Sequence, residues 1–162
     1  QVAETAMATA KMSPQEREQM INGMVERLAG RLQQNPDDID GWTRLGRSYL
    51  VLNNPAKAQE AFAHAVKLDP GDVALKQQYA EAMIEATPGD EVPPQAIDLM
   101  RDVLGAQPQN AEALWYVGIA EAKSGHAQNA HDLWTKLLAQ LPAGAPIRQQ
   151  LQDRIAGLKL DK

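Results

Sequence analysis

The sequence predicts an all-α fold in which pairs of helices stack along one axis, and three observations support this prediction. An apolar pattern that begins at Trp42 recurs further along the chain, beginning at Leu114. Aromatic residues make up only 4% of the chain, so the core is built from small and aliphatic side chains, which suits closely packed helices. Four prolines punctuate the chain at nearly regular intervals: Pro36, Pro70, Pro108 and Pro142.

The recurring residues stand at the offsets typical of the tetratricopeptide repeat (TPR). The first copy consists of Trp42, Leu45, Gly46, Tyr49, Ala58, Phe62, Ala65 and Pro70. The second copy keeps every offset but places Glu121 where the first has a tyrosine, and its other members are Leu114, Val117, Gly118, Ala130, Trp134, Leu137 and Pro142. The sequence therefore predicts a right-handed TPR solenoid of three helix pairs, with a leading helix and a C-terminal capping helix.

A leading helix is predicted at residues 14–34. Ser13, followed by Pro14 and then by Glu16, has the character of a capping box. An apolar stripe then follows at helical spacing: Ile21, Val25, Leu28 and Leu32. Counting back from the first proline makes this helix the second half of a repeat, with Met24 and Leu28 as its packing residues. Residues 1–12 are expected to be disordered, because they lack caps and a strong periodic face.

Residues 13–162 are predicted to form a single TPR domain. Its repeats cover about 39–72, 73–110 and 111–144, and the middle one exceeds the 34-residue period by four residues. We place this insertion near residues 87–94, within the turn-forming stretch TPGDEVPP. The cap, at 145–160, carries an apolar face of Leu151, Ile155 and Leu158.

Small residues are expected to let the two helices of each pair approach closely. On the first helices these are Gly46, Ala80 and Gly118. Their expected partners on the second helices are Ala58, Ala96 and Ala130. Larger residues, Trp42 with Phe62 and Leu114 with Trp134, are expected to lock the pairs.

Composition and motifs argue against nucleic-acid binding, metal binding and catalysis. The net charge of −5 disfavours contact with a phosphate backbone, the mean hydropathy is −0.43, and the chain has no cysteine. Acidic residues at 37, 38 and 40 precede a helix start, where capping explains them better than calcium does. The histidines, His64, His126 and His131, lack metal-ligand spacing. We therefore expect no catalytic residues, no metal, no cofactor and no enzymatic activity.

A partner is expected on the inner wall of the solenoid, which the first helix of each pair forms. The predicted groove residues are Thr43, Arg47, Leu50, Gln77, Gln78, Glu81, Glu85, Trp115, Ile119, Lys123, Arg148 and Gln152. Trp115 has two interpretations: an aromatic anchor in the groove, or a residue packed against the neighbouring helix. The inward Lys and Asn set that grips a terminal carboxylate in some TPR domains is absent. We therefore expect an amphipathic helix or an extended segment, recognised by apolar anchors and by the charged residues of the groove, and the helix is preferred.

Beyond the generic repeat, residues from about 14 to 158 resemble one family. The segments that support this are the leading helix INGMVERLAGRLQQNPDDID joined to GWTRLGRSY, and the stretch PQNAEALWYVGIAEAKSGHAQNAHDLWTKLLAQLP with the following cap. They are similar to CcmI, also called CycH, of bacterial cytochrome c maturation. The resemblance implies the periplasmic domain of a protein anchored in the inner membrane by an N-terminal part.

The same resemblance implies a chaperone that holds apocytochrome c, by its carboxyl-terminal helix, for the proteins of the haem ligation complex. Without thiols the chain could hold the substrate but could not exchange its sulfurs, so reduction would fall to partners. Two other functions stay open. One is a generic TPR scaffold for envelope or secretion complexes that binds another peptide or protein, and the other is a regulatory domain of an enzyme.

Overall fold

The computed structural model describes residues 13–159, and this part of the chain contains eight α-helices and no strand. The helices are α2 (Pro14–Gln34), α3 (Ile39–Val51), α4 (Pro55–Leu68), α5 (Val73–Ala86), α6 (Pro94–Ala106), α7 (Ala111–Lys123), α8 (Ala127–Gln140) and α9 (Ile147–Ala156). The prediction that residues 1–12 are disordered falls outside the described residues.

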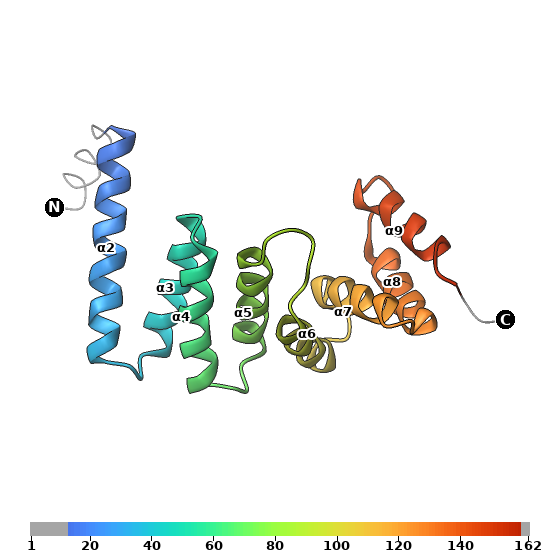
Figure 1. Ribbon diagram of the computed structural model, residues 1–162, viewed down its shortest axis with the longest axis horizontal. Coiled ribbons are helices and arrows are strands. Elements are labelled where there is room, and N and C mark those ends of the chain that lie inside the picture. Colours follow the sequence, from blue (N-terminus) through green and yellow to red (C-terminus); the bar gives the residue numbers. More distant parts are fainter. Residues whose placement is uncertain (1–12, 160–162) are drawn as a thin grey trace.

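The helices form a row in which spatial order follows sequence order (Figure 1). Each helix packs chiefly on the helix before it and the helix after it, and the association is close inside the pairs α3–α4, α5–α6 and α7–α8 and also between α4 and α5. Helix α2 leads the row and α9 closes it. The predicted all-α TPR solenoid of three pairs, a leading helix and a cap is therefore confirmed.

Side-chain caps mark the start of α2 and of the first helix of each pair. In α2, the Ser13 hydroxyl accepts from the Glu16 amide while the Glu16 carboxylate accepts from the Ser13 amide, as the predicted capping box requires. Asp38 accepts from the Gly41 amide at 2.8 Å, which confirms its expected role at the start of α3. Asp72 and Asn110 cap α5 and α7 in the same way, so the first helix of each pair starts at an Asx residue.

Glycines let aromatic rings into the centre of the first and third pairs. A Cβ atom built on Gly46 would lie 2.8 Å from the Phe62 ring, and one on Gly118 would lie 2.6 Å from Trp134 Cδ1. The atoms nearest to each glycine thus belong to an aromatic ring of the opposite helix, and the expected pairing of these glycines with alanines stays a prediction. The small residue makes room for the large ring of the opposite helix, and both rings are almost completely buried.

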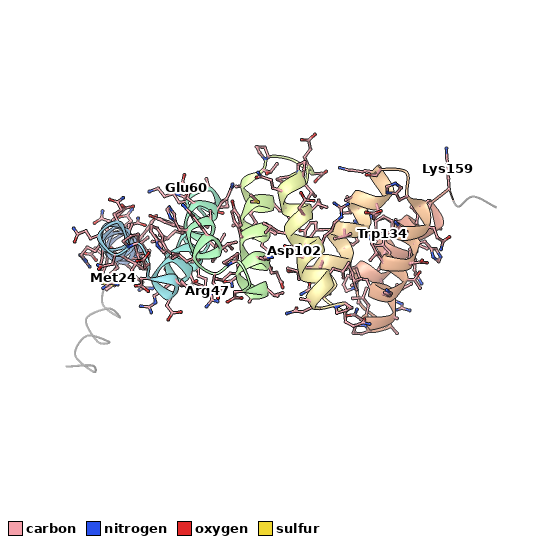
Figure 2. All side chains as sticks on the ribbon, turned by 90° about the horizontal axis from the view of Figure 1, so that it is seen from below. Met24, Arg47, Glu60, Asp102, Trp134 and Lys159 are labelled. Atoms are coloured by element: carbon pink, nitrogen blue, oxygen red, sulfur yellow. The ribbon has the colours of Figure 1, made fainter. Side chains whose placement is uncertain are left out.

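Helix α2 differs from the prediction on its outer face. Val25 and Leu32 are buried, but Ile21 is 36% exposed and Met24, which the sequence predicts to be a packing residue, is 53% exposed. The physical reason is that α2 packs on α3, and no other described helix covers the side that bears Met24. Figure 2 shows Met24 at the α2 end of the row. The same view places Arg47 and Glu60 on opposite sides of the row.

The cap α9 closes the last pair through one apolar cluster and one arginine. Leu151 is fully buried, and Ile155 and Leu158 pack against the cluster that contains Trp134. Arg148 Nη1 donates to the carbonyl oxygens of Leu138 and Leu141, at 3.0 and 2.9 Å. Leu138 O also accepts from the Leu141 amide at 3.3 Å, so Arg148 adds a second donor there and binds the carbonyl of Leu141, the C-cap residue of α8.

Candidate binding groove

The first helices carry equivalent positions because the repeat relates α3, α5 and α7. Moving one repeat at a time along the chain, with the insertion allowed for, links Thr43 with Gln77 and Trp115. The same steps link Arg47 with Glu81 and Ile119, and they link Val51 with Glu85 and Lys123. The inner wall is thus a set of columns whose chemistry changes from one repeat to the next.

Between α3 and α5 the wall is hollowed, with a cavity of about 350 Å³. Three predicted groove residues, Thr43, Arg47 and Gln78, line it together. Arg47 Nε donates to Gln78 Oε1 at 2.7 Å, which ties the two first helices. Leu50, also predicted for the groove, is partly buried and packs against the core cluster that contains Trp42 and Phe62.

Between α5 and α7 the wall is a hydrogen-bonded network. Gln77 Nε2 donates to Glu81 Oε1 at 2.8 Å and to Glu112 Oε2 at 2.6 Å, while Gln77 Oε1 accepts from Asn110 Nδ2 at 2.9 Å. Sequence reasoning missed Asn110 and Glu112. The repeat held a signal for Glu112, because this residue is the third-repeat equivalent of Asp40, which lines the hollow between α3 and α5.

This network makes the middle of the groove acidic. Burial raises the pKa of Glu81 to about 7, and the neighbouring Glu112 carboxylate and the charge of Glu85 act in the same direction. The pKa of Tyr116 is also raised, by burial first and then by the charges of the same three carboxylates. A cation from a ligand would relieve this repulsion, so the centre of the wall favours a basic group.

At the far end, the predicted groove residues turn partly toward the cap. The Trp115 ring lies 6.4 Å from that of Trp134, and the Arg154 guanidinium lies 5.1 Å above the Trp115 ring. Ile119 packs beside the cluster that contains Trp134, and Arg148 donates to carbonyls at the C-terminal end of α8. Lys123, Gln152 and Glu85 are exposed. Packing of Trp115 on its neighbours is the arrangement observed, and its contact with a ligand stays a prediction.

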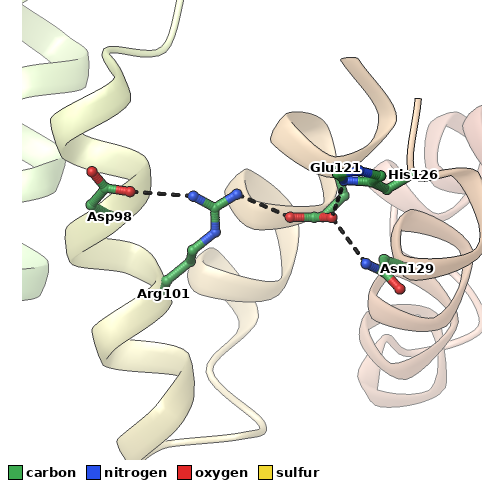
Figure 3. Close-up of polar contacts among 5 residues, drawn as sticks. All are labelled: Asp98, Arg101, Glu121, His126 and Asn129. Atoms are coloured by element: carbon green, nitrogen blue, oxygen red, sulfur yellow. Dashed lines mark hydrogen bonds and ion pairs between the residues drawn. The ribbon is translucent and has the colours of Figure 1, made fainter. Parts of the chain in front are cut away.

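A second polar chain joins α6, α7 and α8 away from the acidic centre (Figure 3). Arg101 donates to Asp98 at 3.2 Å and to Glu121 at 3.0 Å, and Glu121 is also bonded to His126 and Asn129. The amide of Asn129, then Arg101 and His126, hold the pKa of Glu121 below its ordinary value. The glutamate that breaks the tyrosine pattern thus joins α6, α7 and the start of α8.

Residues 13–159 contain no group of three or more His, Cys, Asp or Glu residues placed to hold a metal ion. Among the same residues, none of the helices is long and apolar enough to cross a membrane.

The sequence matches a family described as the TPR domain of cytochrome c-type biogenesis protein H over residues 3–148. It is 30% identical over 132 residues to the cytochrome c-type biogenesis protein CycH of Pseudomonas aeruginosa, covering 82% of this chain and 32% of the relative. It is 31% identical over 127 residues to CcmH of Escherichia coli, covering 78% of this chain and 36% of the relative. CycH of Bradyrhizobium diazoefficiens is 44% identical over 80 residues, 49% of this chain and 22% of the relative. The chain thus spans about a third or less of the length of these relatives.

Solved structures with the same architecture include two crystal structures of MamA. One has a TM-score of 0.64 at 18% identity and covers 95% of this chain and 87% of its own, and the other has a TM-score of 0.60 at 16% identity. At these identities the likeness shows the TPR fold alone.

Proposed function

Because the chain belongs to the TPR-domain family of cytochrome c-type biogenesis protein H, we propose that its groove holds apocytochrome c, by that protein's carboxyl-terminal helix, for haem ligation. Its homologues are cytochrome c-type biogenesis proteins, and they support a role in cytochrome c maturation. In this proposal the domain works in the periplasm, anchored through a membrane-bound part of the full-length protein, and hands its cargo to other maturation proteins.

The observation that supports a held helix is the order of charges along the wall. Arg47 lies on α3, the carboxylates of Glu81 and Glu112 lie on α5 and α7, and Lys123 ends α7. A ligand helix whose charges follow the opposite order, acidic, basic and then acidic, would place a charge of opposite sign against each of these three parts of the wall. Helix-in-groove recognition uses such charges to set register, while apolar contacts supply most of the affinity.

The proposal is tested by calorimetric titration of the domain with a peptide matching the carboxyl-terminal helix of the host's apocytochrome c. The folded holocytochrome serves as the control ligand, since its helix is already packed. We expect saturable binding of the peptide and none of the holoprotein.

Two charge-reversal variants test which side of the row binds the peptide. Glu85→Lys changes the acidic centre of the groove, and Glu60→Lys makes the same change on α4, on the opposite side of the row from Arg47 (Figure 2). Both glutamates are exposed, so neither variant disturbs the core. We expect weaker binding only for Glu85→Lys. Equal affinities would move the contact off this wall, and a wild-type domain that ignores both peptide and full-length apocytochrome would leave a generic scaffold with another cargo.

A further inference from the structure

The four-residue insertion of the middle repeat borders a hollow between α6 and α7. The connection from α5 to α6 covers residues 87–93, whereas residues 52–54 and 124–126 suffice in the other two pairs. Val92 from this longer connection packs against the core cluster that contains Met100 and Val103, which holds the loop in place. The hollow, here named the insertion pocket, has a volume of about 260 Å³ and lies between the loop, α6 and α7.

The insertion pocket has an apolar floor made by Val92, Ile97, Ile119 and Ala120. Comparison with the preceding repeat shows that this floor is particular to one junction. Where α4 meets α5, the residues equivalent to Ile97 and Ile119 are Gln59 and Glu81, both polar. The change from a polar to an apolar pair coincides with the insertion, which is what a site for an apolar group requires.

Two basic side chains lie at the rim of the pocket, and within the described residues only one of them is ion-paired. Arg101 is bonded to Asp98 and Glu121, and Glu121 is held in turn by His126 and Asn129 (Figure 3). Lys123, on the α7 side of the rim, is exposed and makes no ion pair or side-chain hydrogen bond within the described part of the chain. The pocket therefore combines an apolar floor with an exposed positive charge.

We propose that the insertion pocket receives one aliphatic side chain of the groove-bound helix, while Lys123 pairs with a carboxylate one turn away on that helix. Residues three or four apart share a helix face, so one ligand helix can offer both groups. A cavity of about 260 Å³ lies below the roughly 300–1,000 Å³ of small-molecule sites, which favours a single side chain over a cofactor. This inference rests on the proposed function. It adds that the ligand helix is recognised here by one aliphatic side chain and one carboxylate.

The test is calorimetric titration of the domain with the apocytochrome carboxyl-terminal helix peptide, comparing the wild type with Ile119→Asn and Lys123→Glu. Lys136→Glu, on an exposed residue of α8 outside the pocket, repeats the charge change as a control. We expect Kd to rise about tenfold or more for each pocket variant and to stay within about twofold for the control. Because salt screens exposed charges, the Lys123→Glu effect should shrink in high salt while that of Ile119→Asn should not.

A loop variant that lacks residues 89–92 supplies an independent readout, because it restores the short connection of the other pairs without touching α7. It should keep the helical circular dichroism of the wild type and lose affinity as Ile119→Asn does. Wild-type binding that all three variants preserve would overturn the pocket and leave the proposed function standing. A wild-type domain that does not bind the peptide would overturn both.

Discussion

The first and third repeats follow the same sequence pattern, yet they exchange their largest residues between helices. In the first, Trp42 stands on α3 opposite Phe62 on α4. In the third, Leu114 stands on α7 opposite Trp134 on α8. Trp42 lies at the edge of its pair, 8% exposed, with its indole N–H donating to the Pro36 carbonyl at 2.8 Å. Trp134 lies at the centre of its pair and is 2% exposed.

This exchange shows that the repeat does not require a particular residue at each position. It requires that the two facing side chains together fill the space between the helices of a pair. The position of Trp42, at the edge of its pair, also accepts different residues in different repeats. Trp42 stacks on His64 at 4.2 Å, and at the equivalent places of the middle repeat Lys76 pairs with Asp102. An aromatic stack in one pair and an ion pair in the next therefore join the two helices at equivalent positions.

The largest expected effect comes from truncating the central ring. Trp134→Ala should lower the free energy of unfolding by about 5 kcal/mol, and Trp42→Ala by about 3 kcal/mol, because the first leaves an enclosed cavity and the second a partly open one. Urea denaturation followed by circular dichroism measures both. Equal losses would show that position within the pair does not matter, and a Trp42→Ala protein as stable as wild type would remove Trp42 from the core.

The glycines test how tightly each ring is seated. Gly118→Ala should cost about 2–3 kcal/mol and Gly46→Ala about 1–2 kcal/mol, because an indole has less room to shift than a phenyl ring. Thermal melts of the two variants under identical conditions give the comparison. A Gly118→Ala protein with the wild-type melting temperature would mean that the α7–α8 pair can widen freely.

The middle repeat adds a pH test at Glu81, the position held by Arg47 in the first repeat and Ile119 in the third. Its pKa is about 7 in the folded chain and 4.5 in the reference state, so the unfolded state releases its proton first as pH rises. Stability should therefore fall between pH 4.5 and 7. Glu81→Gln should remove that fall and be more stable than wild type at pH 8 by roughly 1–2 kcal/mol, allowing for solvent screening. Glu60→Gln, which removes an exposed carboxylate on the opposite side of the row, is the control.

The smallest effect is expected at Glu121, which replaces the tyrosine of the first repeat. Its folded pKa is lowered, so its contribution is present above its ordinary value of 4.5 and is lost as pH falls through the folded pKa. Glu121→Gln should cost about 1 kcal/mol at pH 7 and nothing in strong acid. Chemical denaturation at the two pH values measures this, and a cost independent of pH would assign the effect to packing.

Much of this architecture can be predicted from the sequence, because repeat periods and caps are local signals. The sequence predicts the leading helix at residues 14–34, and the structure has it at Pro14–Gln34. The Gln77–Glu112 bond, by contrast, joins two helices and depends on how each is rotated. The prediction for Met24 fails because it assumes that a first helix lies against every second helix. Burial of that kind depends on neighbours, which a period alone does not supply.

The row of consecutive contacts also has a mechanical consequence. Because each helix leans chiefly on its two neighbours, a force applied between α2 and α9 would load the interfaces in series. The chain should then lengthen in several small steps, starting at its least buried end, rather than yield in one. A segment bound along the first helices would contact several repeats at once and resist their separation. The bound cargo would therefore increase the stiffness of the row.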